Sequence, residues 1–118
     1  MPKVMLVEDD ETLIGLLQTL LKMEGFEVAV PQRESIDTLT TALRQTRPEV
    51  ILMDVHMRGA NGLDLLRQIR RDPDLAKINI IMTSGMDLED QCLAAGANSF
   101  LLKPFIPDEL VHAIHQNI

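Results

Sequence analysis

Short apolar runs that stop abruptly at polar residues are the feature of this sequence that most restricts its fold. Residues 4–7 form one such run, which stops at Glu8-Asp9-Asp10, and residues 50–53 form another, which stops at Asp54. A strand that is apolar on both of its sides is typical of a parallel sheet covered by helices on both faces. The runs therefore predict buried parallel strands with charged residues at their ends.

Stretches with helical spacing of apolar residues separate these runs. Leu13, Leu17 and Leu20 illustrate the spacing in the first stretch, where Asp10 is a suitable N-cap. Strands are expected at residues 4–7, 27–30, 50–53, 78–83 and 100–102, and helices between 10 and 25, over 35–46, between 61 and 72, over 88–95 and from 107 onward. This alternation indicates an α/β fold with one parallel sheet, in a single domain over residues 1–118.

The composition disfavours several classes of protein. Acidic residues outnumber basic ones by 18 to 11, and the net charge of −7 argues against direct binding to nucleic acid. Cys92 is the only cysteine, so an internal disulfide and a pair of zinc-binding thiolates are excluded. No signal-peptide pattern and no apolar run of membrane-spanning length is present, so we expect a cytoplasmic protein.

Four of the expected strands end in residues suited to chemistry. The first is followed by Glu8-Asp9 and the third by Asp54. The fourth ends in Thr83-Ser84-Gly85, and the fifth is followed by Lys103-Pro104. Functional groups in such sheets gather at the carboxyl ends of the strands. The topology thus predicts a cluster of acids, a hydroxyl and a lysine at one edge of the sheet.

The acids at these strand ends indicate a cation site. Three carboxylates in one pocket repel one another, and a hard divalent cation such as magnesium relieves that repulsion. Asp9 and Asp54 are candidates for direct contact with the metal, and Glu8 for contact through water. The alternative for Glu8-Asp9 is a solvated loop that caps the first helix. Asp54 follows four apolar residues, where a charge is costly unless it has a partner or a task.

Lys103 and Ser84 would complete a site for phosphoryl transfer. A carboxylate such as Asp54 can attack a phosphoryl group and form an acyl phosphate. The Lys103 ammonium would neutralise the transferring oxygens, and the Ser84 hydroxyl would donate to one of them. The alternatives, a surface lysine and a turn serine, are reasonable for each residue alone but not for both together.

These residues lie in segments that resemble one known family over essentially the whole chain. The chain is similar to the receiver domains of bacterial two-component response regulators. The matching segments are VMLVEDD (4–10), VILMDVHMRGANGLDLLRQIR (50–70), IIMTSG (80–85), CLAAGANSFLLKPF (92–105) and PDEL (107–110). The resemblance implies a flavodoxin-like, doubly wound fold: a five-stranded parallel sheet in the order 2-1-3-4-5, with five helices on its two faces.

The resemblance also implies a role for each acid of the site. Asp54 corresponds to the phospho-acceptor of the family, and Glu8 and Asp9 to its acidic pair. Magnesium is then expected to contact Asp9, Asp54 and the backbone carbonyl of His56. The side chain of His56 is expected to be exposed and to affect phosphoryl lifetime, and the alternatives are a phosphoryl relay or a metal ligand.

Three further positions correspond to the switching residues of the family. Ser84 matches the hydroxyl that senses the phosphoryl group, and Thr83 is its rival. Lys103 matches the family's lysine, and its peptide bond to Pro104 is expected to be cis. Phe100 lies at the aromatic switch position, although it would also serve as a plain core residue.

The chain departs from the family pattern in three places. Arg58 stands in Met57-Arg58-Gly59 where many relatives have Met-Pro-Gly, which adds a cation near the site. The stretch 84–96 is shorter than in many relatives, so the fourth helix or its leading loop should be short. Ile106 precedes Pro107 where relatives often have a polar cap, and it would serve a partner surface instead.

The implied function is signalling rather than turnover catalysis. A sensor histidine kinase or a histidine phosphotransfer protein would donate the phosphoryl group, and no contact with a membrane is expected. The receiver would then act on a downstream protein or on an effector domain that this chain lacks. The resemblance also allows a dimer through the face formed by the fourth helix, fifth strand and fifth helix.

Three other functions can be compared with this one. A receiver-like module that binds without phosphorylation would not need the acids, the hydroxyl and the lysine together. A phosphatase of the haloacid-dehalogenase type would need an Asp two residues after Asp54, where this chain has His56. A flavodoxin-like cofactor binder would need a phosphate loop after the first strand and aromatic stacking groups, but Glu8-Asp9-Asp10 stands there, and Trp and Tyr are absent.

Overall fold

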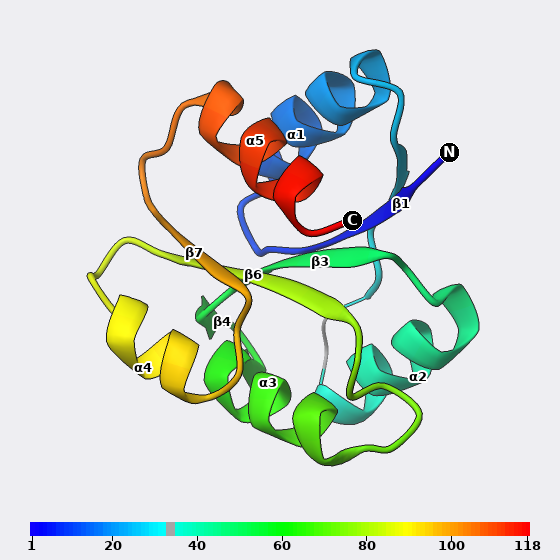
Figure 1. The fold of residues 1–118 in the computed structure, drawn as a ribbon, viewed down its shortest axis with the longest axis vertical. Coiled ribbons are helices and arrows are strands. Elements are labelled where there is room, and N and C mark those ends of the chain that lie inside the picture. The colour runs from blue at the N-terminus through cyan, green and yellow to red at the C-terminus, as the bar shows by residue number, and fades with distance from the viewer. Residues whose placement is uncertain (33–34) are drawn as a thin grey trace.

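A central parallel sheet separates two layers of helices in the computed structural model, which describes residues 1–32 and 35–118 (Figure 1). The described sheet strands are β1 (Lys3–Val7), β2 (Glu27–Ala29), β3 (Val50–Asp54), β6 (Asn79–Ser84) and β7 (Ser99–Leu102). The described helices are α1 (Glu11–Met23), α2 (Ile36–Thr46), α3 (Gly62–Arg71), α4 (Glu89–Ala94) and α5 (Pro107–Gln116). Helices α1 and α5 cover one face, and α2, α3 and α4 cover the other (Figure 1).

The strand order in the described part of the chain is β2-β1-β3-β6-β7, and every neighbouring pair is parallel. Two short strands, β4 (His56–Met57) and β5 (Ala60–Asn61), lie between β3 and β6 along the chain. The strands of the sheet, counted among themselves, therefore follow the expected order 2-1-3-4-5. The α/β class and the parallel sheet are confirmed.

The β4–β5 hairpin was not predicted from the sequence. Its strands pair antiparallel, with His56 opposite Asn61 and Met57 opposite Ala60. Arg58 and Gly59 form the turn, and Gly59 has a φ of 80°, which glycine adopts without strain. Two-residue strands carry no readable alternation of apolar and polar residues, so the pattern gave no signal for them.

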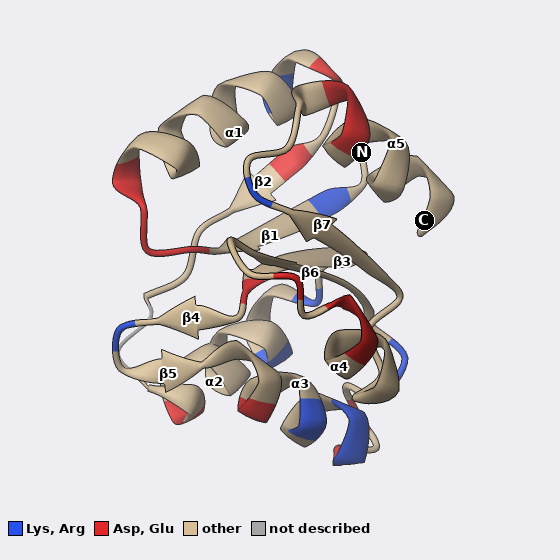
Figure 2. Cartoon of the chain, turned by 90° about the vertical axis from the view of Figure 1, so that its left-hand side faces the viewer, with Lys and Arg blue, Asp and Glu red and all other residues tan. Residues whose placement is uncertain are grey.

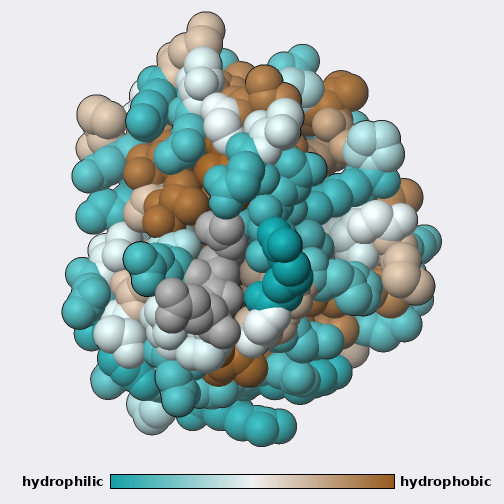
Figure 3. Space-filling model, turned by 180° about the vertical axis from the view of Figure 1, so that it is seen from behind, coloured by the Kyte–Doolittle hydropathy of each residue, from teal (hydrophilic) through white to brown (hydrophobic). Residues whose placement is uncertain are grey.

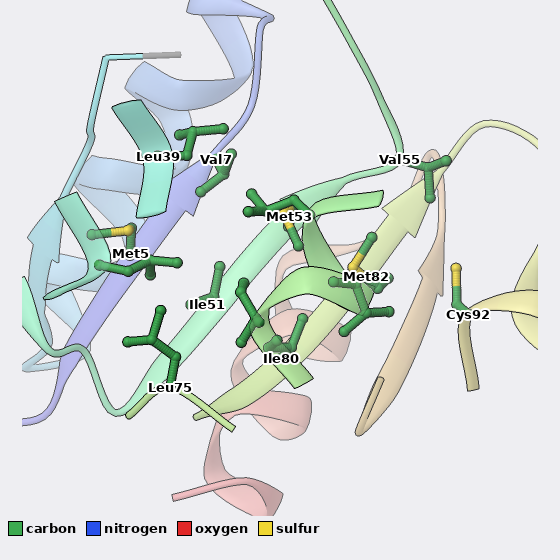
Figure 4. Packing of buried hydrophobic residues seen from close by; sticks show 14 residues of the cluster. Met5, Val7, Leu39, Ile51, Met53, Val55, Leu75, Ile80, Met82 and Cys92 are labelled. Atoms are coloured by element: carbon green, nitrogen blue, oxygen red, sulfur yellow. The ribbon is translucent and has the colours of Figure 1, made fainter. Parts of the chain in front are cut away.

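Alternating side chains of the central strands supply both cores. In β3, Ile51 and Met53 pack toward α2 and α3, whereas Val50 and Leu52 pack toward α1 and α5. Figure 4 shows the first of these cores, with Met5 of β1 and Ile80 of β6 near Ile51. Residues 50–54 are all buried, as expected for a strand covered on both faces.

The helices next to the polar strand ends begin at residues that the sequence had marked. The Asp10 carboxylate accepts from the Leu13 N–H at 3.1 Å, which confirms Asp10 as the N-cap of α1, directly after the acidic loop. Ile106 occupies the N-cap of α5 and is exposed, and the Glu109 carboxylate accepts from its N–H at 3.4 Å. Helix α4 covers only six residues, in line with the shortened stretch before Gly96.

Helix α1 leaves apolar side chains uncovered. Leu16 is 64% exposed and Met23 80% exposed, and both line a groove of about 500 Å³ together with Phe105 and Pro107. Hydrophobic residues lie among hydrophilic ones in the upper part of Figure 3, the half of the molecule to which α1 belongs. None of the helices in the described residues is long and apolar enough to span a membrane.

Candidate functional site

Parallel pairing brings the polar strand ends to one edge of the sheet. The register of β3 with β6 sets Asp54 beside Thr83, and the register of β6 with β7 sets Ser84 beside Leu102, one residue before Lys103. Glu8 directly follows β1 on the other side of β3. The acidic loop between β1 and α1 lies at this edge, as does the basic turn of the β4–β5 hairpin (Figure 2).

The Lys103 ammonium joins two buried carboxylates. Its Nζ lies 3.0 Å from Asp54 Oδ2, and 3.1 and 3.0 Å from the two Glu8 carboxylate oxygens. Backbone N–H groups also donate to both carboxylates. The Asp10 N–H donates to Glu8 Oε1 and the His56 N–H donates to Asp54 Oδ1, each at 3.2 Å. The lysine thus holds together residues that lie 95 and 49 positions away in the sequence.

The electrostatics of this trio follow from burial and shared charge. Burial raises the pKa of Glu8 and the nearby Asp54 charge raises it further, which the hydrogen bond from Lys103 only partly offsets. Burial alone would lower the pKa of Lys103, but its hydrogen bonds to Asp54 and Glu8 outweigh that effect, so the pKa rises. Lys103 is therefore held as a cation beside the Asp54 carboxylate.

The structure separates the two adjacent hydroxyl residues of β6. Thr83 Oγ1 donates to the Leu101 carbonyl at 2.8 Å and is thereby committed to the sheet. Ser84 Oγ is buried and accepts from the Met86 N–H at 3.0 Å, and the Ser84 carbonyl accepts from the Lys103 N–H at 2.8 Å. These contacts favour Ser84 over Thr83 as the hydroxyl at the strand end. The cis peptide between Lys103 and Pro104 is confirmed.

Phe100 lies in β7 beside Met82 and is partly buried. Its ring packs against the core shared with α2, α3 and α4, on the side of the sheet away from α1 and α5. This packing is what a plain core residue would show. The role of Phe100 in switching stays a prediction.

Asp9 is contacted from the β4–β5 hairpin. The Arg58 N–H donates to Asp9 Oδ2, and Arg58 Nε lies 3.9 Å from the same oxygen. The presence of Arg58 in place of the usual proline predicted a cation near the site. Its contact with Asp9, 49 positions away in the sequence, was not predicted. The His56 side chain is exposed, as expected.

Gly62 is a positioning residue that was not predicted from the sequence. Its N–H donates to the Val55 carbonyl at 2.7 Å. A Cβ at this position would lie 2.2 Å from the Asp54 carbonyl oxygen, so any other residue would push α3 away from the end of β3. The Asn-Gly pair before an expected helix was the available signal for this close approach.

The expected magnesium ligands fit that ion by their chemistry. The Asp9 and Asp54 carboxylates and the His56 carbonyl are all oxygen donors, the type that magnesium prefers. A hollow of about 410 Å³ opens beside Asp9, His56 and Asn61. Across residues 1–32 and 35–118, however, no three His, Cys, Asp or Glu side chains are already arranged around one metal position. Glu8 is engaged by Lys103 and Asp9 by Arg58 instead.

Comparisons with family models and with curated proteins identify the same family. The family model of the response regulator receiver domain matches residues 4–115. The DNA-binding response regulator MtrA of Mycolicibacterium smegmatis is 33% identical over 118 residues, which are 98% of this chain and 50% of MtrA. The chain thus spans about half the length of the curated relatives that it matches first.

Solved structures agree with this comparison. A crystal structure of a putative response regulator from Chloroflexus aurantiacus superposes with a TM-score of 0.88 at 29% identity, over 98% of this chain and 97% of that one. The receiver domain of sensor histidine kinase PA1611 from Pseudomonas aeruginosa has the same fold, with a TM-score of 0.84 at 24% identity over 98% of this chain and 96% of that one. Its structure is described with a magnesium ion coordinated in the active site cleft.

Proposed function

Because the chain belongs to the family of response regulator receiver domains, we propose that it is switched by a phosphoryl group carried on Asp54. One observation supports this most: the Asp54 carboxylate is buried at the end of β3 and its Oδ2 lies 3.0 Å from the Lys103 ammonium. In that setting the carboxylate oxygens are shielded from bulk water and lie beside a cation, which suits a carboxylate that acts as a nucleophile.

The transfer itself needs only one bond to form and one to break. An Asp54 carboxylate oxygen attacks the phosphorus of a phosphohistidine, and the new P–O bond forms as the P–N bond breaks. The electron pair of that bond returns to the imidazole nitrogen of the donor. Lys103 neutralises negative charge on the phosphoryl oxygens, and His56 N–H holds the carboxylate in place through Oδ1.

Asp9, Asp54 and the His56 carbonyl would hold magnesium, and Glu8 would contact it through water. A bound magnesium ion supplies positive charge that offsets the charge of the transferring phosphoryl group. The ion described in the cleft of the PA1611 receiver supports this proposal, as do the oxygen donors of this chain.

Phosphorylation would be transmitted through Ser84 and Phe100. The phosphoryl group adds charge and acceptor oxygens, and the Ser84 hydroxyl would exchange its contact with the Met86 N–H for one of them. Phe100 would then turn further into the core. Moving the receiver from mostly inactive to mostly active requires about 5 kcal/mol of differential stabilisation.

The output would be read on the face formed by α4, β7 and α5. This face exposes Leu93 of α4 and Leu102 of β7, and Ile106 at the start of α5 is 58% exposed. Apolar groups on an otherwise polar surface favour contact with protein, either a second receiver, an effector domain or a separate target. The name of MtrA, a DNA-binding response regulator of twice this length, supports an effector domain as one of these readers.

The phosphoryl donor would be a sensor histidine kinase or a histidine phosphotransfer protein. An apolar hollow bordered by Leu13, Leu16 and Phe105 reaches Lys103 and Pro104, so it adjoins the site. A protein donor that approaches Asp54 would cover this surface. In the cycle the receiver transfers and later hydrolyses its own phosphoryl group, and so it is not a turnover enzyme.

The proposal is tested by weighing the intact protein after incubation with a small-molecule phosphodonor and magnesium. We expect a mass gain of one phosphoryl group that requires magnesium and is lost in Asp54→Ala. Asp64→Ala, which removes an exposed acid from α3, is the control and should keep the gain. A wild-type protein without the gain would favour a binding module that works without phosphorylation, and a gain retained in Asp54→Ala would show that another residue carries the phosphoryl group.

A further inference from the structure

The acids of the site are compensated in two separate ways. Glu8 and Asp54 share the Lys103 ammonium, which is fixed between them. Asp9 is instead contacted by the turn of the β4–β5 hairpin, through both the N–H and the guanidinium of Arg58. The hairpin thus brings a cation of its own to the carboxylate that is proposed as a magnesium ligand.

The Arg58 guanidinium is exposed, so it can be removed by substitution with little effect on packing. The side chain is 90% exposed, whereas that of Asp9 is 22% exposed. An exposed ion pair contributes little to folding, so its loss should leave the fold intact. Any effect of this residue should therefore appear in the site, not in stability.

We propose that Arg58 is a negative determinant of divalent-cation affinity, which competes for the Asp9 carboxylate and is displaced when the cation binds. This inference rests on the proposed function, because it takes Asp9 as a metal ligand. The guanidinium and a divalent cation at the same carboxylate repel each other, so part of the binding free energy is spent on moving Arg58 away. The backbone N–H is compatible with metal binding, since an ionised carboxylate has several acceptor positions.

Two substitutions separate the charge from the backbone donor. Arg58→Ala removes the guanidinium and keeps the N–H, whereas Arg58→Pro removes both. Arg67→Ala is the matched control, because it deletes an equal charge from an exposed pair with Asp64 on α3. A general effect of net charge would appear in all three proteins.

The test is calorimetric titration of MgCl₂ into each metal-free protein at low and high salt. We expect Arg58→Ala to bind Mg²⁺ about two- to fivefold more tightly than wild type, the range set by an exposed ion pair. The gain should shrink at high salt, because screening weakens the competing charge. Arg58→Pro should bind at least as tightly as wild type, and thermal unfolding should show each variant folded.

Distinct results overturn the inference and the proposed function. Arg58→Ala with wild-type or weaker affinity, or an equal gain in Arg67→Ala, contradicts the role of Arg58 alone. A folded wild-type protein and variants that all fail to bind Mg²⁺ contradict the metal site itself, and the inference with it.

Discussion

At the scale of single residues, Glu8 and Asp54 share one ammonium group. Lys103 is close enough to both for hydrogen bonds, yet two buried carboxylates against one cation leave an excess of negative charge. The pKa of Glu8 is raised because burial, and to a smaller extent the negative charge of Asp54, disfavour its ionised form. The folded protein thus retains unfavourable charge at the place where we propose that a divalent cation binds.

This excess predicts a pH dependence of stability. Because the pKa of Glu8 is raised in the folded state, the stability linked to this group is complete below its usual value of 4.5 and is lost as the pH rises through the raised pKa. Glu8→Gln should therefore gain stability relative to wild type as the pH rises through this range. Urea unfolding at a series of pH values, with a chelator present, measures the difference.

Glu24→Gln removes the same charge from an exposed position and serves as the control. A difference between Glu8→Gln and wild type that stays constant with pH, or that matches the control, would contradict the raised pKa of Glu8.

The adjacent hydroxyl residues predict separable effects. Thr83→Val should lower the free energy of unfolding by about 1–2 kcal/mol, because the buried bond to the Leu101 carbonyl is lost. Ser84→Ala should keep the phosphoryl mass gain but lose the accompanying shifts of backbone amide resonances in α4 and β7. NMR spectra with and without phosphodonor give this readout. If phosphorylated Ser84→Ala shows the same resonance shifts as phosphorylated wild type, Ser84 has no role in the switch.

At the scale of elements, Arg70 ties the end of α3 to the segments before β6 and β7. Its Nε donates to the Gly96 carbonyl at 2.8 Å, and its other nitrogens donate to the Ala76 and Ile78 carbonyls and to Asn98 Oδ1, at 2.6 to 2.9 Å. Gly96 has a φ of 110°, and a Cβ there would lie 2.9 Å from Arg70 Cγ. The turn after α4 is therefore fixed from α3, at the end of the sheet away from the site.

Arg70 should accordingly matter for stability and not for phosphoryl transfer. We expect Arg70→Ala to lower the free energy of unfolding by about 2–4 kcal/mol, because several carbonyl groups lose a charged donor. Arg67→Ala on the same helix should change it by less than about 0.5 kcal/mol. Denaturant unfolding measures both, and a similar small change in the two variants would show that the Arg70 contacts contribute little.

Elements were predictable where a pattern is long enough to read. The apolar runs of β1 and β3 are buried on both sides, so their composition alone indicated parallel strands. The β4–β5 hairpin is too short for such a pattern, and its contact with Asp9 joins residues 49 positions apart. No local rule reports a contact of that separation, although the unusual Arg58 marked the position.

At the scale of the whole molecule, the site could be predicted because a parallel sheet has one functional edge. Once the strand ends were assigned, Glu8, Asp54 and Lys103 had to lie near one another, and the structure places them within hydrogen-bonding distance. The sequence could not show which carboxylates Lys103 and Arg58 would contact. That choice depends on side-chain geometry, which set Lys103 between Glu8 and Asp54 and left Asp9 to Arg58.

The identity of the residue that carries the phosphoryl group decides whether the proposed function is correct. Protein treated with phosphodonor and magnesium can be trapped with borohydride, which reduces an acyl phosphate, and then mapped by peptide mass spectrometry. We predict that the reduced residue is Asp54, and that hydroxylamine releases the phosphoryl group before trapping. A phosphoryl group that resists hydroxylamine on Ser84, or one carried by His56, would contradict the central claim.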